Sequence, residues 1–546
     1  MPDSAAPPRF THRQILVIFS GLAVSMLLAA LDQTIVATAL PTIVGDLGGL
    51  KHISWVVTAY LLTTTASTPI YGKISDIYGR KRIFQIAIVI FLLGSALSGL
   101  SQNMLELIAF RALQGLGAGG LMTLAMTIIG EVVPPRDRGR YQGLIGAVFA
   151  LSSVAGPLLG GFFVDNLSWR WVFYINLPLG AAALFITSVA LKLPARRLEH
   201  RIDYFGAALL TAAVSSGLLA ISWGGTEYPW GSTPILGLAA AAAVLTSVFL
   251  LVESRAEEPI IPLRLFRNDV FAVGVLESFI VGFGMFSAII YLPLFLQIVR
   301  GQSAMRSGLL LIPMTFGIVV SSVSSGRWIS KHGRYKVFPI AGTAVAAVGL
   351  FLCSRLTTDT SLVVFSASIL IVGAGIGLVM QVLVIAIQNA VAHRDLGAAT
   401  GTSVFMRSLG GSFGIAVGGA VLTNRLDANL ARYVPRGVGA HLSAGQMSSP
   451  AVIRGLPPEI YHGIALAFAH SVDDVFLFSA PFLVLGCIIA FFLRELPLRT
   501  GHGPMIVEEA SAFDEEMPEA EDLAPDEPQR RSATGELSPS PESFEP

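Results

Sequence analysis

Residues 72–84 read GKISDIYGRKRIF, and this stretch decides the fold because long apolar runs stand on both sides of it. A chain that leaves one hydrophobic helix and enters the next within about a dozen residues needs a tight turn, and Gly72 and Gly79 permit the close backbone approach. Four bases lie in the same stretch, at Lys73, Arg80, Lys81 and Arg82. By the positive-inside rule they predict a cytoplasmic turn. Asp76, an acid among these bases, predicts a specific partner for its carboxylate.

The composition predicts a polytopic membrane protein. Hydrophobic residues make up 53% of the 546 residues and charged residues 13%, a balance that soluble globular proteins do not have. At roughly 20 apolar residues for each crossing, the chain holds enough apolar sequence for about a dozen or more spans. The two cysteines, Cys353 and Cys487, lie inside apolar runs, so we expect no disulfide framework, no metal site and no cofactor.

Fourteen apolar runs predict fourteen transmembrane helices. They cover residues 14–40, 53–73, 83–101, 104–131, 140–164, 170–191, 203–223, 233–252, 269–298, 304–328, 336–355, 361–390, 397–423 and 473–493. An even number of spans places both termini on one side of the membrane, and placing them in the cytoplasm gathers most of the lysines and arginines there. Residues 499–546 are rich in acids and proline, and we expect them to form a disordered cytoplasmic tail.

A repeat divides the predicted helices into two related halves. The glycines and bases of the Gly72 turn recur 254 residues later, around Gly326, and the same shift relates Gly156 to Gly410. Six helices fill about 180 residues, so the longer offset leaves room for one extra two-helix hairpin between the halves. The expected order is a cytoplasmic N-terminus, a first half, an inserted hairpin, a second half with a long outer loop at 424–472, and the tail, at 1–13, 14–201, 202–256, 257–498 and 499–546.

Further motifs stand in the predicted first half. They are Arg111, Gln114, Gly115 and Gly117 in the fourth span, Gly156, Pro157, Gly160 and Gly161 in the fifth, LDQTIVATALP at 31–41, and WRWVFYINLPLG at 169–180. Together with residues 72–84 they resemble the major facilitator superfamily, and in particular its fourteen-helix drug:proton antiporter family. The resemblance covers nearly the whole chain and implies an all-α fold of two six-helix halves plus a two-helix insert. One departure is that Ser330 stands where Asp76 would map in the second half, which argues against a symmetric pair of acidic gates.

Charged side chains inside the predicted spans carry the expected mechanism, because an ionised group at a helix centre costs on the order of 2.5 to 3.5 kcal/mol. Asp32 lies in the first span, where low hydration favours proton uptake and release as a central cavity containing it opens to either side. The alternative is an acid satisfied by Thr34 or by an arginine of another helix. Arg111, deep in the fourth span, has the proton-coupling role that the resemblance implies, with a buried packing ion pair as the alternative.

The second half contributes polar groups of its own. Glu277 and Arg407 are charges within its spans, and we assign Glu277 to proton coupling and Arg407 to the substrate cavity. The alternatives are that Glu277 reaches the cytoplasmic surface and that Arg407 ties helices together. Gln381, Gln388 and Asn389 are candidates for hydrogen bonds to cargo in that cavity, with contact between helices as the alternative.

Two groups of residues predict conformational change. In the fifth span, Pro157 removes one helical hydrogen bond and the three glycines of its motif let neighbouring helices approach, which predicts a kinked and tightly packed seam. At the first turn, Asp76 is predicted to meet the positive N-terminus of a second-half helix, and Arg80 to meet Glu131. Solvated loop charges are the alternative. The predicted conformational gate consists of Gly72, Asp76, Gly79, Arg80 and Glu131.

The predicted function is export of drugs or amphiphilic toxic compounds from the cytoplasm or inner leaflet, in exchange for protons and by alternating access. This function implies a bacterial plasma or inner membrane and a role in multidrug efflux and antibiotic resistance. One alternative is proton-coupled export of a specific endogenous lipid or metabolite, and another is a non-transporting receptor or scaffold. We expect no enzymatic activity and no nucleic-acid partner, because the glycines of RALQGLGAGG follow no strand and no phosphate-binding loop is present.

Overall fold

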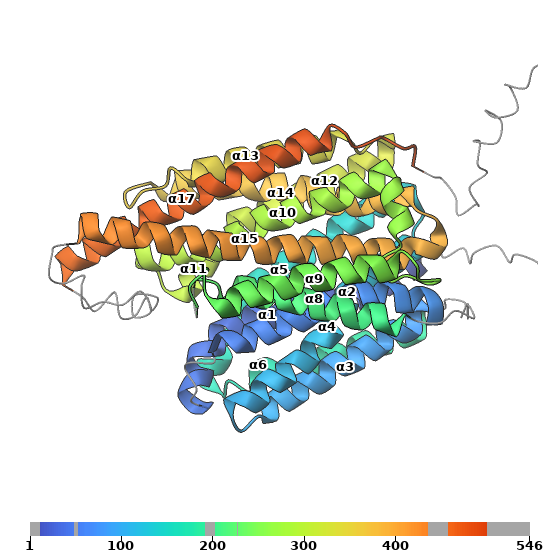
Figure 1. The fold of residues 1–546 in the computed structure, drawn as a ribbon, viewed down its shortest axis with the longest axis horizontal. Coiled ribbons are helices and arrows are strands. Elements are labelled where there is room, and N and C mark those ends of the chain that lie inside the picture. Colours follow the sequence, from blue (N-terminus) through green and yellow to red (C-terminus); the bar gives the residue numbers. More distant parts are fainter. Residues whose placement is uncertain (1–10, 48–52, 192–202, 226–227, 435–456, 499–546) are drawn as a thin grey trace, which may run out of the picture. The chain divides into compact units, whose positions relative to one another are not determined.

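The protein is described by a computed structural model over residues 11–47, 53–191, 203–225, 228–434 and 457–498. Within these residues the regular elements are helices, most of them long and packed side by side (Figure 1). The helices are α1 His12–Leu47, α2 Ile53–Tyr78, α3 Arg80–Leu100, α4 Met104–Val132, α5 Pro135–Asn166, α6 Trp171–Tyr174, α7 Asn176–Ala190, α8 Tyr204–Trp223, α9 Thr233–Glu253, η2 Leu263–Arg267, α10 Asp269–Leu294, η3 Phe295–Val299, α11 Ala304–Leu310, α12 Ile312–His332, α13 Val337–Cys353, α14 Leu362–Ala390, η4 His393–Asp395, α15 Leu396–Tyr433 and α17 Pro458–Ala490. The predicted tail at 499–546 lies outside the described residues.

Each of the fourteen predicted spans coincides with a helix or a pair of helices. Twelve stretches of the described chain are long and apolar enough to cross a membrane, by length and composition. α13 is apolar but has only 17 residues, and α2 does not belong to the twelve because serines and threonines fill its middle. A helix tolerates these hydroxyls because they donate to its own carbonyls, as Thr63 does to Ala59 and Thr68 does to Thr64.

The long outer loop predicted at 424–472 is shorter than expected. α15 continues to Tyr433 and α17 already begins at Pro458, so both helices extend into the predicted loop. Beyond their apolar stretches the two helices still contact each other through polar side chains, since Asn429 Nδ2 donates to Ser471 Oγ over 3.0 Å. Hydropathy identifies only the apolar part of a helix, so it misses the polar turns by which α15 and α17 continue beyond that part.

Gly79 and Gly333 occupy the same place in the two halves. Gly79 follows α2 with a backbone φ of +92°, and Gly333 follows α12 with a φ of +76°. Both values favour glycine, because a side chain strains the backbone in this region. We call the end of the helical bundle that carries these two turns the Gly79 end, and the other end the opposite end.

The glycines of α4 and α14 also pack in the same way. A Cβ added to Gly115 would collide with Tyr60 of α2. A Cβ added to Gly373 would collide with Met314 of α12, which follows Tyr60 by the same 254 residues that separate the two turns. The sequence repeat therefore reflects two halves in which equivalent helices approach each other at equivalent glycines.

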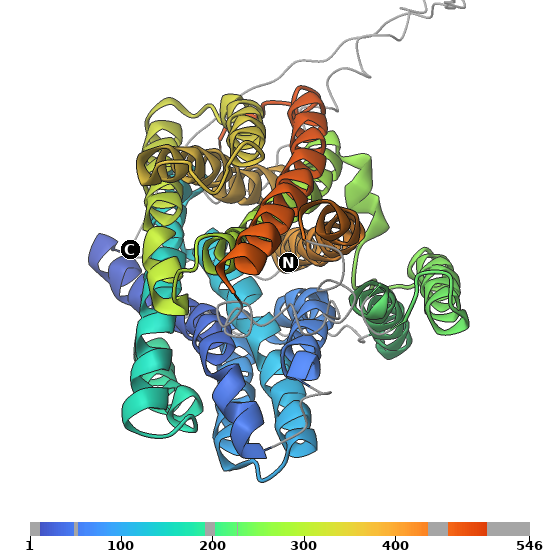
Figure 2. The same ribbon diagram turned by 90° about the vertical axis from the view of Figure 1, so that its left-hand side faces the viewer.

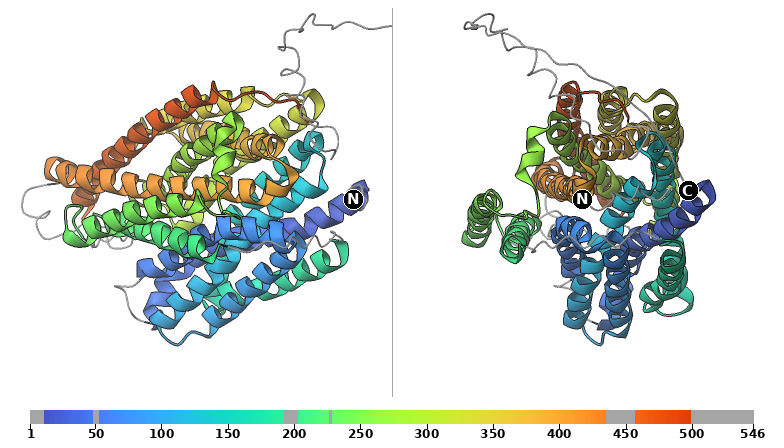
Figure 3. Two further views of the ribbon diagram at one scale, coloured as in Figure 1. Left: turned by 45° about the vertical axis from the view of Figure 1, so that its right-hand side comes forward. Right: turned by 90° about the vertical axis from the view of Figure 1, so that its right-hand side faces the viewer.

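The inserted hairpin lies beside the two halves. Figure 2 shows the first half in blue to teal, the second half in light yellow-green to red, and α8 with α9 in darker green at one side. Figure 3 shows the same separation from further directions. α8 packs against α2 and α15 through a cluster that includes Leu210, Ala66 and Phe405. The ion pair between Lys73 Nζ and Glu258 Oε2, at 2.5 Å, joins α2 to the segment after α9.

Candidate functional site

A buried polar network inside the first half surrounds Asp32 of α1. The residue has no exposed surface, and its carboxylate accepts three hydrogen bonds from other helices. Arg111 Nη1 of α4 donates to Oδ2 over 2.5 Å, Gln114 Nε2 of α4 donates to Oδ1 over 2.7 Å, and Asn176 Nδ2 of α7 donates to Oδ1 over 3.0 Å. Two amides and one guanidinium thus supply hydrogen bonds that compensate the buried carboxyl group for the water it has lost.

The guanidinium of Arg111 is enclosed just as fully. It lies over the ring of Tyr60, 4.1 Å from the ring centroid, and its Nη1 also donates to Gln114 Oε1 over 2.8 Å. A glycine makes room for this pair of helices, because a Cβ at Gly94 of α3 would collide with the backbone of Gln114. The close approach of α3 to α4 thereby positions the amide that contacts Asp32.

The polar partners of Asp32 all belong to the first half. The carboxylate therefore lies inside the bundle of that half, and the expectation that it lines a central cavity between the halves is wrong for this conformation. The alternative reading, an acid satisfied by an arginine of another helix, describes its contacts here. The rotation of α1 about its own axis determines whether Asp32 points into the first half or toward the second, and the sequence does not reveal that rotation.

Glu277 of α10 is the buried acid of the second half. It has no exposed surface, and neither of its carboxylate oxygens has a hydrogen-bond partner among the described residues. The side chain faces α17 and α13, since a Cβ at Gly486 would lie 3.6 Å from Glu277 Oε2 and 3.5 Å from Thr343 Cγ2. Glu277 does not reach the surface, so that alternative is wrong. The structure does not bring it to the Asp32 network.

The residues predicted to line the substrate cavity fall into two sets. Gln381 of α14 and Arg407 of α15 are 2% and 6% exposed, and neither side chain has a partner among the described residues. Gln388 instead joins the two halves, as its Nε2 donates to Met126 O of α4 over 3.1 Å. Asn389 Nδ2 donates to the carbonyl of Pro497 over 3.2 Å, and its contact is with the segment after α17. The contact of Gln388 thus favours the alternative, contact between helices, whereas Asn389 ties α14 to the non-helical segment after α17.

Asp76 of α2 lies against the N-terminus of α15, a helix of the second half. Its Oδ1 accepts from the backbone N–H of Gly397 over 3.1 Å and its Oδ2 from that of Ala398 over 3.0 Å. A carboxylate at this place satisfies two N–H groups that have no partner within the helix, and its charge complements the helix dipole. The structure thus brings Asp76 to the kind of partner that the sequence predicted.

Arg80 joins the two halves at the same end. Its Nη1 lies 2.9 Å from Glu131 Oε2, and its Nη2 donates to Asp76 Oδ1 over 3.0 Å. The same Nη2 donates to the backbone carbonyl of His393, in the second half, over 3.2 Å. His393 Nε2 in turn lies 3.6 Å from Glu131 Oε1. Three of the five predicted gate residues, Asp76, Arg80 and Glu131, therefore form one connected set of contacts with His393, and the role of the predicted gate stays a prediction.

Two glycine contacts bring the halves together beside this set. A Cβ at Gly72 of α2 would collide with the carbonyl oxygen of Gly397 of α15. A Cβ at Gly139 of α5 would collide with the carbonyl oxygen of Gly326 of α12. Gly326 follows Gly72 by the 254 residues of the repeat, and Gly397 follows Gly139 by 258, so the two pairs are close to equivalent. They bring the halves into contact at the Gly79 end.

The motif of α5 packs as expected at two of its three glycines. A Cβ at Gly156 would collide with Thr34 of α1, and one at Gly160 would lie 3.0 Å from the carbonyl oxygen of Ile35. The expectation of close packing is wrong for Gly161, because no atom lies within 4 Å of the place where its Cβ would be. The motif thus fixes α5 against α1 on one face only. Pro157, on the other side, contacts α11 of the second half, 3.3 Å from a Cβ built on Gly308.

At the opposite end, Asp46 lies past the apolar part of α1. It accepts from Trp169 Nε1 over 2.8 Å and from Arg170 Nη1 over 3.1 Å. The hydrogen bond from Trp169, followed by that from Arg170, holds the pKa of Asp46 below its usual value. No feature of the sequence around Asp46 predicts this contact.

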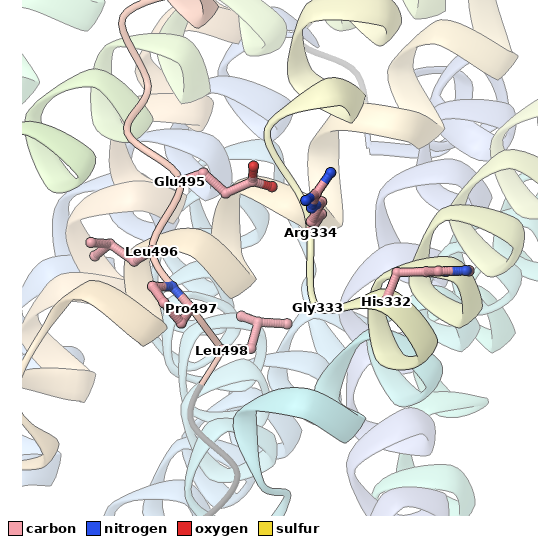
Figure 4. A pocket seen from close by; sticks show the side chains of 7 residues that line it. All are labelled: His332, Gly333, Arg334, Glu495, Leu496, Pro497 and Leu498. Carbon is pink, nitrogen blue, oxygen red and sulfur yellow. The ribbon is translucent and has the colours of Figure 1, made fainter.

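A surface pocket lies at the Gly79 end of the second half, between the α12–α13 turn and the segment after α17 (Figure 4). Its volume is about 440 Å³, and Figure 4 shows Glu495 on one wall and Arg334 on the other. The lining residues are His332, Gly333, Arg334, Glu495, Leu496, Pro497 and Leu498. Because the predicted site residues do not line it, the pocket is separate from the buried charges.

Three residues of the Asp32 network have no role among the predicted site residues, namely Gln114, Asn176 and Tyr60. Gln114 belongs to the motif of the fourth span, and Asn176 stands alone as an amide in the apolar stretch FYINLPLG at 173–180. A lone amide inside an apolar run is a usable signal, since it needs a hydrogen-bond partner at membrane depth. Tyr60 gives no such signal, because aromatic residues are common in spans.

The chain is similar to known membrane transporters in sequence and in fold. The profile of the Major Facilitator Superfamily matches residues 22–415. An uncharacterized MFS-type transporter of Mycobacterium tuberculosis is 44% identical over 486 residues, covering 89% of this chain and 70% of the relative. The multidrug transporter protein MdtP of Bacillus subtilis is 38% identical over 511 residues, covering 88% of this chain and 93% of the relative. The solved structure of the proton:xylose symporter XylE shares the fold, with a TM-score of 0.59 at 15% identity over 90% of this chain and 98% of that chain.

Proposed function

This chain belongs to the major facilitator superfamily, and from that premise we propose that it exports drugs or other amphiphilic compounds in exchange for protons by alternating access. The superfamily consists of transporters, so the protein is an integral membrane transporter and not an enzyme. The relative from Bacillus subtilis is by its name a multidrug transporter, which supports the cargo class. We place the protein in a bacterial plasma membrane, which the relatives from Mycobacterium tuberculosis and Bacillus subtilis support. Both termini are assigned to the cytoplasm, because Arg80, Lys81 and Arg82 lie at the Gly79 end.

The single observation that carries proton coupling is the buried pair of Asp32 and Arg111. Removing one charge from a buried ion pair costs about 3–5 kcal/mol, because the other charge is left without compensation. Protonation of Asp32 removes its charge in the same way, so Arg111 must then find other partners and the helices that hold it must shift. Proton binding and a rearrangement of α1, α4 and α7 are thereby coupled in free energy.

The contacts that close the Gly79 end support a change between two conformations as the second part of the mechanism. Asp32 has no exposed surface in this conformation, so it exchanges its proton with solvent only in another one. The contacts of Asp76 and Arg80 stabilise closure on the cytoplasmic side, and their loss opens the cavity to cargo from the cytoplasm. Two conformations with different access to Asp32 are what an exchange of protons for cargo requires.

Glu277 provides a second titratable group in the second half. A carboxyl group buried without any donor costs less free energy when it is uncharged. In this conformation Glu277 therefore carries its proton, and it releases the proton only when a rearrangement of α10, α13 and α17 brings water or a donor to it. We assign it to proton coupling on this basis, as a group separate from Asp32.

Flux through the purified protein tests the proposal. The full chain is reconstituted into sealed vesicles, a pH step is imposed, and uptake of fluorescent amphiphiles of positive, negative and zero charge is followed. Native flux of at least one probe is expected to rise with the proton gradient, and Asp32→Asn is expected to lose that response. Asp46→Asn is the matched control, because it removes an acid of the same helix that lies 52% exposed at the opposite end.

Native flux that ignores the pH step would refute proton coupling. No flux of any probe would favour a receptor or scaffold instead. An Asp46→Asn variant that loses the response as fully as Asp32→Asn would show that the loss reflects the helix as a whole and not the buried pair.

A further inference from the structure

Two buried polar side chains have no partner among the residues that the structure describes, Arg407 of α15 and Gln381 of α14, and we propose that they bind the anionic head of an amphiphilic substrate at the junction of the two halves. The inference rests on the export function proposed above and adds the charge of the cargo to it. Its experiment measures binding without a gradient, so the two proposals fail separately.

Both side chains lie at the same depth. Gln388 of α14 donates to Thr400 of α15 over 3.1 Å, and the same amide donates to Met126 O of the first half. Gln381 comes seven residues before Gln388, and Arg407 comes seven residues after Thr400. Seven residues are about two turns of helix, or roughly 10 Å, and they return to nearly the same face. α14 ends and α15 begins at the Gly79 end, so both steps lead from the Gln388 contact toward the middle of the membrane.

Residues between these positions show which way the two faces point. Val384 lies between Gln381 and Gln388, and Val404 lies between Thr400 and Arg407. Both valines are buried in the hydrophobic cluster formed mainly by helices of the first half. The face of α14 that carries Gln381 is therefore turned toward the first half. Arg407 lies between the first-half side of α15 and α10, because a Cβ at Gly282 of α10 would collide with the Arg407 carbonyl oxygen. Both positions thus border the junction of the halves, where a transporter of this architecture holds its substrate.

Over the described ranges of the chain, no acid forms an ion pair with Arg407. Asp32 is paired with Arg111 within the first half, and Glu277 faces α13 and α17. The Arg407 guanidinium is always charged, and a charge at this depth is unfavourable without a partner. Gln381 adds an amide whose nitrogen and oxygen both lack a hydrogen bond among the described residues. Arg407 therefore lacks a negatively charged hydrogen-bond acceptor, and Gln381 lacks a hydrogen-bond partner.

A carboxylate fits this requirement. Its two oxygens match the fork of the guanidinium, and one of them can also accept from the amide of Gln381. The apolar body of the cargo would lie against surroundings such as Phe149 of α5, which packs against the main hydrophobic clusters of both halves. The favoured substrate class is thus a carboxylate-bearing amphiphile, in preference to a cationic one.

Equilibrium binding to the full chain in lipid nanodiscs tests the charge preference. Three fluorescent probes share a dansyl group and an eleven-carbon chain and end in a carboxylate, its methyl ester or an ammonium group. Native protein is expected to bind the carboxylate about tenfold or more tightly than the ester. Arg407→Gln is expected to abolish that preference, and Arg407→Lys to keep part of it. Arg494→Gln removes an exposed arginine at the Gly79 end and serves as the control that keeps the native preference.

Equal or tighter binding of the ester or the ammonium probe by native protein would overturn the inference, as would an unchanged preference in Arg407→Gln. If Arg407→Gln does not fold, Arg407→Lys decides, since a carboxylate preference of about threefold or more supports the inference and equal binding overturns it. Gln381→Leu gives a second readout, with an expected loss of a few-fold in carboxylate affinity alone. A carboxylate preference without pH-driven flux would sink the export proposal and leave this inference standing, and the reverse result would do the opposite.

Discussion

Replacing Gly72 with alanine is expected to open the Gly79 end. The new Cβ would collide with the carbonyl oxygen of Gly397 and lie 3.0 Å from its carbonyl carbon. Because these are backbone atoms, no side-chain rotation relieves the contact, and overpacking of this kind costs about 1–3 kcal/mol. Only the conformation in which α2 touches α15 bears this cost. The equilibrium is therefore expected to shift about 5- to 150-fold toward the opened conformation.

Distances between spin labels measure this shift. Labels on cysteines at Tyr78 and Arg394 report on the separation of α2 from the start of α15, and both side chains are exposed, at 42% and 71%. The background carries alanine at Cys353 and Cys487. In nanodiscs the native protein is expected to show one short distance, and Gly72→Ala is expected to add a longer one.

The matched control is Gly161→Ala, because a Cβ at Gly161 meets no atom within 4 Å. This variant is expected to leave the distance distribution unchanged, whereas Gly139→Ala, at the equivalent contact with Gly326, is expected to behave like Gly72→Ala. A folded Gly72→Ala protein with the native distribution would refute the reasoning. So would a Gly161→Ala variant that shifts the distances equally.

Further perturbations test other parts of the structure. Asp32→Asn is expected to lower the free energy of unfolding by about 3–5 kcal/mol, and a second change, Arg111→Gln, should restore part of it in thermal denaturation, because the unpaired charge is then gone. Gly79→Ala and Gly79→Asn should each lower the free energy of unfolding by about 1–3 kcal/mol, because φ +92° with ψ 129° suits glycine alone. Gly333→Asn should be nearly neutral, because φ +76° with ψ 1° is a left-handed conformation that asparagine adopts. Equal shifts of the melting temperature for asparagine at the two turns would contradict this. The lowered pKa of Asp46 means that its contribution to stability is present above the unfolded value of about 3.9 and is lost as the pH falls through the folded value. The melting difference between native protein and Asp46→Asn should thus stay constant from about pH 5 to 8 and shrink below about pH 4, and a change across the neutral range would count against the Trp169 contact.

The superfamily and its helical fold were predictable from the sequence, and both are confirmed. The lipid interior forces each crossing segment to satisfy its own backbone hydrogen bonds, so an apolar run of sufficient length already specifies a helix. The repeat of the Gly72 turn at Gly326 indicated two related halves for a similar reason, since a side chain at either position would collide with backbone atoms and only glycine fits there. Composition failed only where helices continue beyond the membrane, as α15 and α17 do.

The pairing of buried charges was decided by tertiary structure. Asp32 and Glu277 read alike in the sequence, as single acids inside apolar runs. Within the described part of the chain, however, Asp32 has three donors and Glu277 has none. Which neighbours a buried side chain meets depends on the rotation of its helix about its own axis and on its depth relative to helices far away in the chain. Hydropathy contains neither quantity, because it averages over all faces of a helix. The sequence therefore determined which segments enter the membrane, and the packing of those segments determined which charges face each other and which are left for a proton or a substrate.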